Sequence, residues 1–237
     1  MSLVKLLSPV GRLVSYLNYK ADRLRLAKLM GRGLKVGKNV YIMEGVEFDL
    51  DYPFLIAIGD NCRISKGVRI LAHDATTFRH LGVTRLAPVR ILDDTFIGER
   101  ALIMPGVTIG PRTVVAAGSF VNRDFGGGAM VAGNPARAYG KYDDLLEKYE
   151  AMLSTATVFS REDLDRGRVS HEDMRRTVER EGAAFSQGVP GRDPFYVNAD
   201  YSEMRAKALR AYERVRSRLA SATTDSAEDA RENRHSK

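Results

Sequence analysis

An aliphatic residue returns at every sixth position along the middle of the chain. The positions are Ile91, Ile97, Ile103, Ile109, Val115 and Val121. Neither the period of a helix nor the alternation of a strand produces a strict repeat of six. Such a repeat is typical of a coil with three flat faces, in which each face takes a short strand and a turn. The pattern therefore predicts a repetitive, mainly β architecture.

A second column, of small residues, supports this prediction. Four positions after successive aliphatic residues stand Thr95, Ala101, Val107, Thr113 and Ser119. Two faces converge at the corner of a coil, so only a small side chain fits beside the large aliphatic residue that fills the interior. Gly98 and Gly110 directly follow their aliphatic residues. At these two glycines we expect the backbone to need a positive φ.

The same register occurs twice earlier in the chain. It runs through Val36, Ile42 and Phe48, and then through Ile58, Ile64 and Ile70. A slip of four residues separates these two blocks, and a larger excursion follows the second block. We therefore expect one coiled domain over residues 34–138, with a loop at residues 74–88.

The segment before the coil, residues 1–33, has the pattern of a basic amphipathic helix. Its apolar residues Leu13, Val14, Leu17, Leu24 and Leu29 alternate with Arg12, Lys20, Arg23, Arg25 and Lys28. Two interpretations stay open. The helix could cover the open end of the coil and hide a sheet edge that would otherwise recruit other chains. Alternatively, it could make a peripheral contact with anionic membrane lipid.

Helical signals replace the six-residue repeat after the coil. The spacing of Leu145, Leu146, Tyr149 and Leu153 predicts a helix over residues 143–153. Ser160 and Ser170 are each followed three residues later by an aspartate, which is a variant of the capping box. A break at Gly188, Pro190, Gly191 and Pro194 precedes a long helix expected over about 201–219. We expect a helical extension over residues 139–220 and a disordered polar tail over residues 221–237.

The composition agrees with a globular protein of modest size. The 237 residues are 44% hydrophobic, enough for a coil plus an additional lobe. The sequence has no apolar run of the length that spans a membrane, and its first ten residues show no secretory pattern. The single cysteine, Cys62, falls on the column of small residues, where we expect a buried structural thiol. A cytoplasmic protein is expected.

The net charge of +7 is concentrated at the start of the chain. Residues 1–33 hold seven basic residues and one acidic residue, whereas residues 34–138 hold 12 and 10, and residues 139–237 hold 18 and 19. A nucleic-acid-binding surface would combine clustered basic residues with stacking aromatics or a recognisable motif. Neither is evident in the sequence, so no nucleic-acid partner is expected.

The stretch from Val36 to Arg137 resembles the hexapeptide-repeat acyltransferases, in particular the sugar O- and N-acetyltransferases. The matching segments read IGDNCRISKGVRI, LAHD, FIGERALIMPGVTIGPRTVVAAGSFV and AGNPAR. Parallel crossovers are otherwise almost always right-handed, so the left hand of the coil is implied by the resemblance alone. The fold class expected is mainly β with helical additions. In it, a left-handed parallel β-helix is flanked by an N-terminal helix and a C-terminal helical lobe.

The chemistry is expected where the coil breaks its own pattern. Ile70 begins a repeat, so position 74 should be small and apolar, but it is Asp74, preceded by His73. In the related acetyltransferases the histidine that opens such a loop is the general base, which points to His73. Imidazole titrates near neutral pH, so it can take the proton of a sugar hydroxyl or amine as the acyl group leaves a thioester. Adjacent strand residues face opposite ways, so Asp74 is expected to contact the acceptor or shape the loop.

Further acceptor-binding candidates lie in both interruptions of the coil. The loop contains Arg79 and His80, and the first interruption contains Glu47 and Asp49 in a region where the related enzymes position the acceptor sugar. Alternatives stay open for each group. His73 could be an ordinary loop histidine, His80 could be the base, and the carboxylates could be solvated loop residues.

For the acyl donor, the resemblance implies acetyl-coenzyme A in a groove between two neighbouring coils of a homotrimer. The pantetheine arm would follow Gly106, Ala117 and Gly118, where small residues allow a close approach. Arg123 and Arg137 would meet the nucleotide phosphates. The alternative is that the glycines are turn residues and the arginines are solvated.

These expectations describe an acyltransferase, with acyl-coenzyme A and a saccharide acceptor as partners. A thioester is already activated, so direct attack needs neither a covalent enzyme intermediate nor a metal, and no metal is expected. One alternative is a non-catalytic scaffold or binding solenoid. Another is a γ-type carbonic anhydrase, which needs three imidazoles around zinc. Only His73 and His80 fall within the coil, which disfavours the zinc enzyme.

Overall fold

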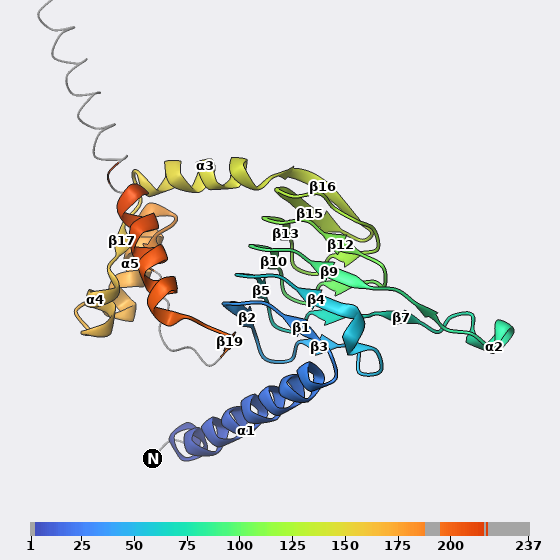
Figure 1. The fold of residues 1–237 in the computed structure, drawn as a ribbon. Coiled ribbons are helices and arrows are strands. Elements are labelled where there is room, and N and C mark those ends of the chain that lie inside the picture. Colours follow the sequence, from blue (N-terminus) through green and yellow to red (C-terminus); the bar gives the residue numbers. More distant parts are fainter. Residues whose placement is uncertain (1–2, 188–194, 216, 218–237) are drawn as a thin grey trace, which may run out of the picture. The chain divides into compact units, whose positions relative to one another are not determined.

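The computed structural model describes residues 3–187, 195–215 and 217. The chain divides into two compact units (Figure 1). The first comprises Met1–Tyr142 with Pro194–Ala199, and the second comprises Asp143–Asp193 with Asp200–Lys237. The expected break at residues 188–194 and the expected tail at residues 221–237 lie outside the described residues.

The first unit contains three sheets of parallel strands through which the chain passes in turn. One sheet orders β1 (Lys35–Val36), β4 (Ile56–Ile58), β9 (Val89–Ile91) and β12 (Thr108–Ile109). A second orders β2 (Val40–Ile42), β5 (Arg63–Ile64), β10 (Phe96–Ile97), β13 (Val114–Val115) and β15 (Ala129–Gly133). A third orders β3 (Glu47–Phe48), β6 (Arg69–Ile70), β11 (Leu102–Ile103) and β14 (Phe120–Val121). We call this arrangement the coil.

Antiparallel strands extend the second sheet of the coil at both ends. β16 (Ala136–Lys141) pairs with β15, and β19 (Tyr196–Val197) pairs with β2. The residues of β19 return to the first unit after the helical segment, which the sequence analysis did not foresee. A strand of two residues carries too little periodicity to be recognised.

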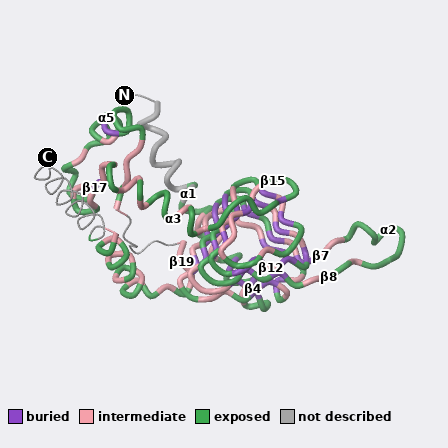
Figure 2. The backbone as a smooth tube through the Cα atoms, turned by 90° about the horizontal axis from the view of Figure 1, so that it is seen from above, coloured by how far each residue is buried: buried purple, intermediate pink, exposed green. Residues whose placement is uncertain are grey.

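The aliphatic column of the sequence becomes the interior of the coil. In the second sheet, Ile42, Ile64, Ile97 and Val115 are partners in register. Their exposed fractions are 2% or less. In the view of Figure 2, buried residues recur along the strands of the coil. Burying one such side chain contributes about 1.5–3 kcal/mol to the free energy of folding. The repeated aliphatic residues therefore supply much of the stability of the coil.

The column of small residues is buried at the corners, as predicted. The hydroxyl groups in it donate to backbone carbonyls: Thr95 Oγ1 to Gly110 O and Thr113 Oγ1 to Gly126 O, each over 3.0 Å. These bonds satisfy polar groups that burial would otherwise leave unpaired. Cys62 is fully buried, and burial raises the pKa of its thiol to about 11. The thiol is therefore protonated at neutral pH and fits the structural role expected for it.

The positive φ expected at Gly98 and Gly110 is wrong, because neither residue has one. A Cβ atom on Gly98 would lie 2.5 Å from the backbone nitrogen of Ala117, and one on Gly110 would lie 2.4 Å from that of Gly127. The backbone of the next turn of the coil passes too close to both positions for any side chain to fit. Steric exclusion by this backbone, and not the backbone conformation, therefore requires glycine at both positions.

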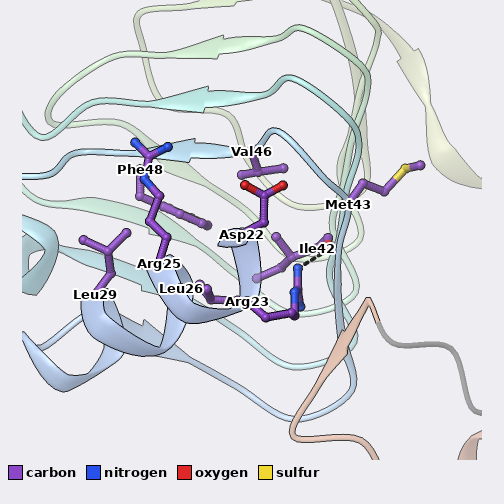
Figure 3. A pocket seen from close by; sticks show the side chains of 9 residues that line it. All are labelled: Asp22, Arg23, Arg25, Leu26, Leu29, Ile42, Met43, Val46 and Phe48. Carbon is purple, nitrogen blue, oxygen red and sulfur yellow. Dashed lines mark hydrogen bonds between the residues drawn. The ribbon is translucent and has the colours of Figure 1, made fainter. Parts of the chain in front are cut away.

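α1 (Leu3–Gly31) covers the first turn of the coil with its last turns (Figure 3). Leu26 and Leu29 are buried in the hydrophobic core of the coil. Arg23 donates from Nη2 to the carbonyl of Ile42 over 2.8 Å, and Asp22 accepts the backbone N–H of Gly45 over 2.9 Å. The covering interpretation is therefore confirmed for this end of the helix. None of the helices among the described residues is long and apolar enough to cross a bilayer.

A hairpin interrupts the coil after β6, where the sequence predicts a loop. β7 (His73–Asp74) pairs with β8 (Arg85–Leu86), and α2 (Phe78–Leu81) lies between them. This hairpin, which we call the arm, projects away from the coil (Figures 1 and 2). The shorter first interruption contains a single 3-10 turn, η1 (Pro53–Leu55).

The second unit is mainly helical, as the sequence predicts. It contains α3 (Tyr142–Leu153), α4 (Arg161–Asp165), α5 (His171–Glu181) and helical residues 201–215. β17 (Val158–Phe159) and β18 (Phe185–Ser186) form a small parallel pair. The Ser170 side chain accepts the backbone N–H of Asp173, whose carboxylate accepts that of Ser170, so the predicted capping box is confirmed. Ser160 caps α4 with one half of this arrangement, because its side chain accepts the backbone N–H of Asp163.

Candidate active site

The candidate site lies along the corner of the coil where the chain passes from the third sheet to the first. We call each such corner an edge of the coil, and this one the His73 edge. Asp49 directly follows β3, and His73 lies just beyond the adjacent strand β6. The pairing of Phe48 with Ile70 sets these two segments one above the other, and the backbone N–H of Asp49 donates to the carbonyl of Ile70 over 2.9 Å. Residues 24 positions apart in the sequence are thus brought into contact.

His73 and Asp49 form a tightly hydrogen-bonded pair. The Nδ1 atom of His73 lies 2.5 Å from Oδ2 of Asp49. The Asp49 side chain is fully buried, whereas that of His73 is 30% exposed. A carboxylate only accepts hydrogen bonds, so Nδ1 carries the proton, and Nε2 is the basic nitrogen of the neutral ring. The histidine is therefore oriented on one side by a buried group and remains accessible to solvent.

Backbone groups keep the Asp49 carboxylate charged although it is buried. Burial raises the pKa of this carboxyl, but hydrogen bonds from the backbone of Ala72 and Tyr52 and from His73 outweigh burial and leave the pKa below its ordinary value. Ala72 N–H donates to Oδ2 over 2.9 Å, and the N–H groups of Asp51 and Tyr52 donate to Oδ1 over 3.1 Å each. A charged Asp49 stabilises a protonated imidazole, so the pair suits a histidine that gains and loses a proton.

A groove of about 280 Å³ opens beside His73. It is lined by Arg25, Glu47, Phe48, Asp49, Leu50, Asp51, Arg69, Leu71 and His73. Glu47 and Arg69 face each other across β3 and β6, with Oε2 of Glu47 2.7 Å from Nη2 of Arg69. Tyr52 packs against His73 with the ring centroids 5.3 Å apart. The site therefore combines a basic nitrogen with charged groups that can bind a polar ligand.

Several of these neighbours were missed in the sequence. Arg25 lies in α1, which the repeat pattern does not connect to the site. Arg69 precedes Ile70, and the register of the coil would have placed it opposite Glu47. The four-residue slip between the first two blocks hid that alignment.

Two of the residues expected to contact an acceptor, Asp49 and Asp74, bond other groups of the chain. The Asp49 side chain is fully buried, and its carboxylate bonds the backbone N–H groups of Asp51, Tyr52 and Ala72 and the ring of His73. Asp74 accepts the backbone N–H of Thr76 over 2.9 Å and also the Thr76 hydroxyl. These bonds lower the pKa of the Asp74 carboxyl. These bonds close a local turn at the start of the arm.

The remaining loop candidates lie far out on the arm. Arg79 and His80 belong to α2, at the end of the arm that is remote from the coil (Figure 1). Both are exposed. Within one copy of the chain, the histidine at the coil edge is His73, so the geometry favours His73 over His80 as the base.

The expected donor residues fall into separate groups. Gly106 follows β11 and Arg123 follows β14, so both lie on the edge that carries His73. Gly106 has a φ of +89°, and a Cβ there would lie 3.0 Å from Nη2 of Arg85 at the base of the arm. Ala117 and Gly118 follow β13, which places them on the edge between the second and third sheets. Arg137 lies exposed on β16.

Asp49, Asp51 and His73 also have the ligand types of a metal site. One potential ligand atom of each lies within 4.8 Å of the others. However, the Asp49 oxygens accept three backbone N–H groups, and His73 uses Nδ1 for the same carboxylate. The cluster offers one imidazole, whereas the zinc of a γ-type carbonic anhydrase requires three. The arrangement fits an oriented base better than a metal centre.

Comparison with known proteins identifies the repeat. Residues 88–123 match the family model described as bacterial transferase hexapeptide (six repeats). The chain is 36% identical over 115 residues to the putative acetyltransferase YvoF of Bacillus subtilis, covering 48% of this chain and 64% of YvoF. It is 30% identical over 122 residues to the galactoside O-acetyltransferase of Escherichia coli, covering 50% of this chain and 59% of that protein. The chain thus spans about three fifths of the length of these relatives.

Among solved structures, the chain is similar to a hexapeptide-repeat-containing acetyltransferase, VCA0836 from Vibrio cholerae. The TM-score is 0.43 at 26% identity, with 60% of this chain and 94% of that chain covered. A maltose O-acetyltransferase from Clostridium difficile 630 gives a TM-score of 0.40 at 28% identity, with 46% and 71% covered. The resemblance to hexapeptide-repeat acyltransferases seen in the sequence is confirmed by the family model and by the named relatives.

Proposed function

We propose that this chain, whose coil carries the hexapeptide transferase repeat, is a coenzyme A-dependent acyltransferase built on a left-handed parallel β-helix. It transfers an acyl group, acetyl in the first instance, to a hydroxyl or amine of a saccharide. The observation that carries the proposal is the pair in which buried Asp49 holds Nδ1 of partly exposed His73 at 2.5 Å. The relatives named acetyltransferases, one of them acting on galactosides, support the reaction and the acceptor class.

The reaction follows from the orientation of His73. The acceptor hydroxyl donates a hydrogen bond to Nε2, and its proton passes to that nitrogen as the oxygen attacks the thioester carbon. Asp49 stabilises the imidazolium that forms, and a backbone N–H of the coil holds the oxyanion. When the C–S bond breaks, the departing sulfur takes the proton from Nε2. The products are an acylated saccharide and free coenzyme A, and His73 is neutral again.

The groove beside His73 is the proposed acceptor site. Glu47 and Arg69 pair across the two strands, and Arg25 and Asp51 complete the charged lining. Carboxylate oxygens accept from sugar hydroxyls and guanidinium groups donate to ring and hydroxyl oxygens, so this mixture of charges suits a polyhydroxylated ligand. Glu47 thus remains an acceptor-binding candidate, whereas we assign Asp49 to positioning.

A homotrimer would unite the donor residues. Gly106 and Arg123 lie on the His73 edge, but Ala117 and Gly118 lie on another edge of the same coil. One donor molecule can contact both groups if they come from two neighbouring copies. The arm supports this assembly, because Phe78, Leu81 and Val83 are 59%, 68% and 57% exposed. Apolar side chains gathered on a projecting segment are typical of an interface. Arg79 and His80 would then serve the acceptor site of the neighbour.

Replacement of His73 by alanine tests the proposal. Loss of the base should lower turnover of acetyl-coenzyme A with a saccharide acceptor by about 10²–10⁴-fold. Donor binding should persist, because the imidazole acts on the acceptor proton, and thermal stabilisation by acetyl-coenzyme A measures it. His171→Ala, in the exposed first turn of α5, is the matched control. Turnover by His73→Ala at the rate of the wild-type protein would refute the assignment.

A further inference from the structure

α1 packs on the coil with one face and exposes apolar side chains on the opposite face. Leu26 and Leu29 are 6% and 3% exposed, whereas Leu24 is 72% exposed. Residues two positions apart lie roughly 200° apart around a helix, so Leu24 points away from the coil. Leu17 is 55% exposed and Val14 is 50% exposed. Their spacing of three and seven residues sets Val14, Leu17 and Leu24 in one stripe along the helix.

Lysine side chains border this stripe. Lys20 lies one turn from both Leu17 and Leu24, and Lys28 lies one turn beyond Leu24. Both are exposed. The ammonium group of Lys20 lies 5.4 Å from the centre of the Tyr16 ring, which is itself 54% exposed. An aromatic ring, apolar side chains and flanking cations on one helix face are typical of helices that lie in a membrane interface.

The charge of the segment indicates the occupant of this face. Residues 1–33 hold seven basic residues and one acidic residue, Asp22. Asp22 faces the coil, where it accepts the backbone N–H of Gly45. A second copy of the chain would bring an equally positive helix against the first, which is unfavourable. An anionic surface removes that repulsion and attracts each lysine.

We propose that α1 docks this chain on an anionic lipid surface, with Val14, Leu17 and Leu24 among the lipid headgroups and Lys20 and Lys28 on their phosphates. In this proposal the helix lies along the interface, with its apolar stripe toward the lipid and its buried face on the coil. Arg25, from the same turns of α1, lines the groove with His73. Docking would therefore hold the groove beside the lipid surface. The inference does not rest on the proposed acyl transfer, because its readout is binding.

Sedimentation of the full chain with vesicles tests the proposal. Vesicles of phosphatidylcholine with about one third phosphatidylglycerol should carry the protein into the pellet, and vesicles of phosphatidylcholine alone should not. The double variant Leu17→Ser, Leu24→Ser should lower the partition coefficient by at least about tenfold, because two apolar side chains no longer enter the interface. The matched control is Leu146→Ser with Val178→Ser, two exposed apolar residues of the second unit.

A second variant separates charge from apolar contact. Lys20→Gln with Lys28→Gln should weaken binding to the anionic vesicles by about fivefold for each ammonium removed. This pair alters no buried side chain, so it decides the question if the serine variant fails to fold. The proposal is overturned if the wild-type chain stays in the supernatant or if both variants sediment like the wild type. It is equally overturned if the serine variant changes the oligomeric mass without lipid, since the face would then contact a second copy.

Discussion

At the residue scale, His73 is fixed by two neighbours from the first interruption of the coil. Asp49 binds one ring nitrogen, and the ring of Tyr52 packs beside the imidazole. The carboxylate has two effects that an amide lacks: it selects the tautomer with the proton on Nδ1, and it would stabilise the imidazolium formed in the proposed transfer. Both effects act through His73 and not on the substrate.

Asp49→Asn should therefore lower kcat by about 10²–10⁴-fold, with a smaller change in the KM for acetyl-coenzyme A. The pH profile of kcat should also change, because the Asp49 carboxylate, whose pKa lies below its ordinary value, no longer supplies a charge beside the imidazole. Steady-state kinetics over a range of pH measure both. The control is Asp93→Asn, since Asp93 also accepts a backbone N–H of a neighbouring coil, that of Asp60, but lies away from the His73 edge. A kcat and pH profile like those of the wild-type protein would exclude the positioning role.

The sequence could identify His73 but not its partner. His73 interrupts a regular repeat, and such an interruption is visible without a structure. Asp49 stands in a segment where the register slips by four residues, so the alignment of position 49 with position 73 depends on how the chain absorbs the slip. The structure shows that η1 absorbs it, because the 3-10 turn at Pro53–Leu55 separates β3 from β4. Arg25 could not be inferred at all, because nothing in the repeat relates α1 to the groove.

At the element scale, the spacing between successive turns of the coil is set by close backbone contact at glycine. Gly98→Ala would place a Cβ 2.5 Å from the nitrogen of Ala117, and the rigid backbone of that coil cannot move aside cheaply. We expect the free energy of unfolding to fall by about 1–3 kcal/mol, as for other overpacked sites. Denaturant titration followed by circular dichroism measures the change.

Gly126→Ala is the matched control for this prediction. Gly126 also lies at a corner of the coil, but a Cβ there would meet no atom within 4 Å, and its φ is not positive. The alanine should therefore leave the stability close to that of the wild-type chain. Equal losses from both substitutions would show that the contact between successive turns of the coil does not account for the effect, since the lower entropy of an unfolded chain with alanine acts in the opposite direction.

In the proposed trimer, the arm forms part of the interface between neighbouring chains. Replacing residues 75–84 with Asn-Gly would join β7 directly to β8, whose register pairs Asp74 with Arg85. The coil should remain folded, because these residues contribute no buried hydrophobic side chain to the core. We expect the mass in solution to fall from that of three chains to that of one, as measured by light scattering after size exclusion. An unchanged mass would remove the arm from the interface.

The sequence predicted the elements better where they repeat than where they do not. The same six-residue pattern recurs at every strand of the coil, so a strand can be assigned even where one repeat is irregular. The arm is visible as a gap in this pattern. β19 pairs with β2 across a sequence separation of more than 150 residues, and no local signal marks it. The capping serines of α4 and α5 were recognisable because a capping box is defined by residues only three positions apart.

At the scale of the whole molecule, the proposed site is divided between copies of the chain. The coil is rigid and its edges cannot exchange places, so the His73 edge of one copy meets Ala117 and Gly118 only on a neighbour. A chain with His73→Ala should be inactive, and so should a chain with Ala117→Arg, whose long side chain would block the donor at an exposed corner. The two defects then lie in the two halves of the site.

Co-expression of these two inactive chains distinguishes a shared site from a self-contained one. When the two chains assemble at random, an intact His73 edge meets an intact Ala117 edge at about one quarter of all interfaces, so about one quarter of the wild-type activity should return. Co-expression of His73→Ala with Asp49→Asn is the control. Both of these defects lie on the same edge of their own chain, so no interface regains an intact His73–Asp49 pair and the rate should not exceed the residual activity of Asp49→Asn. If the first mixture also stays inactive, while the mass shows that mixed trimers have formed, each site belongs to a single chain, and the donor groove must be sought on the His73 edge alone, around Gly106 and Arg123.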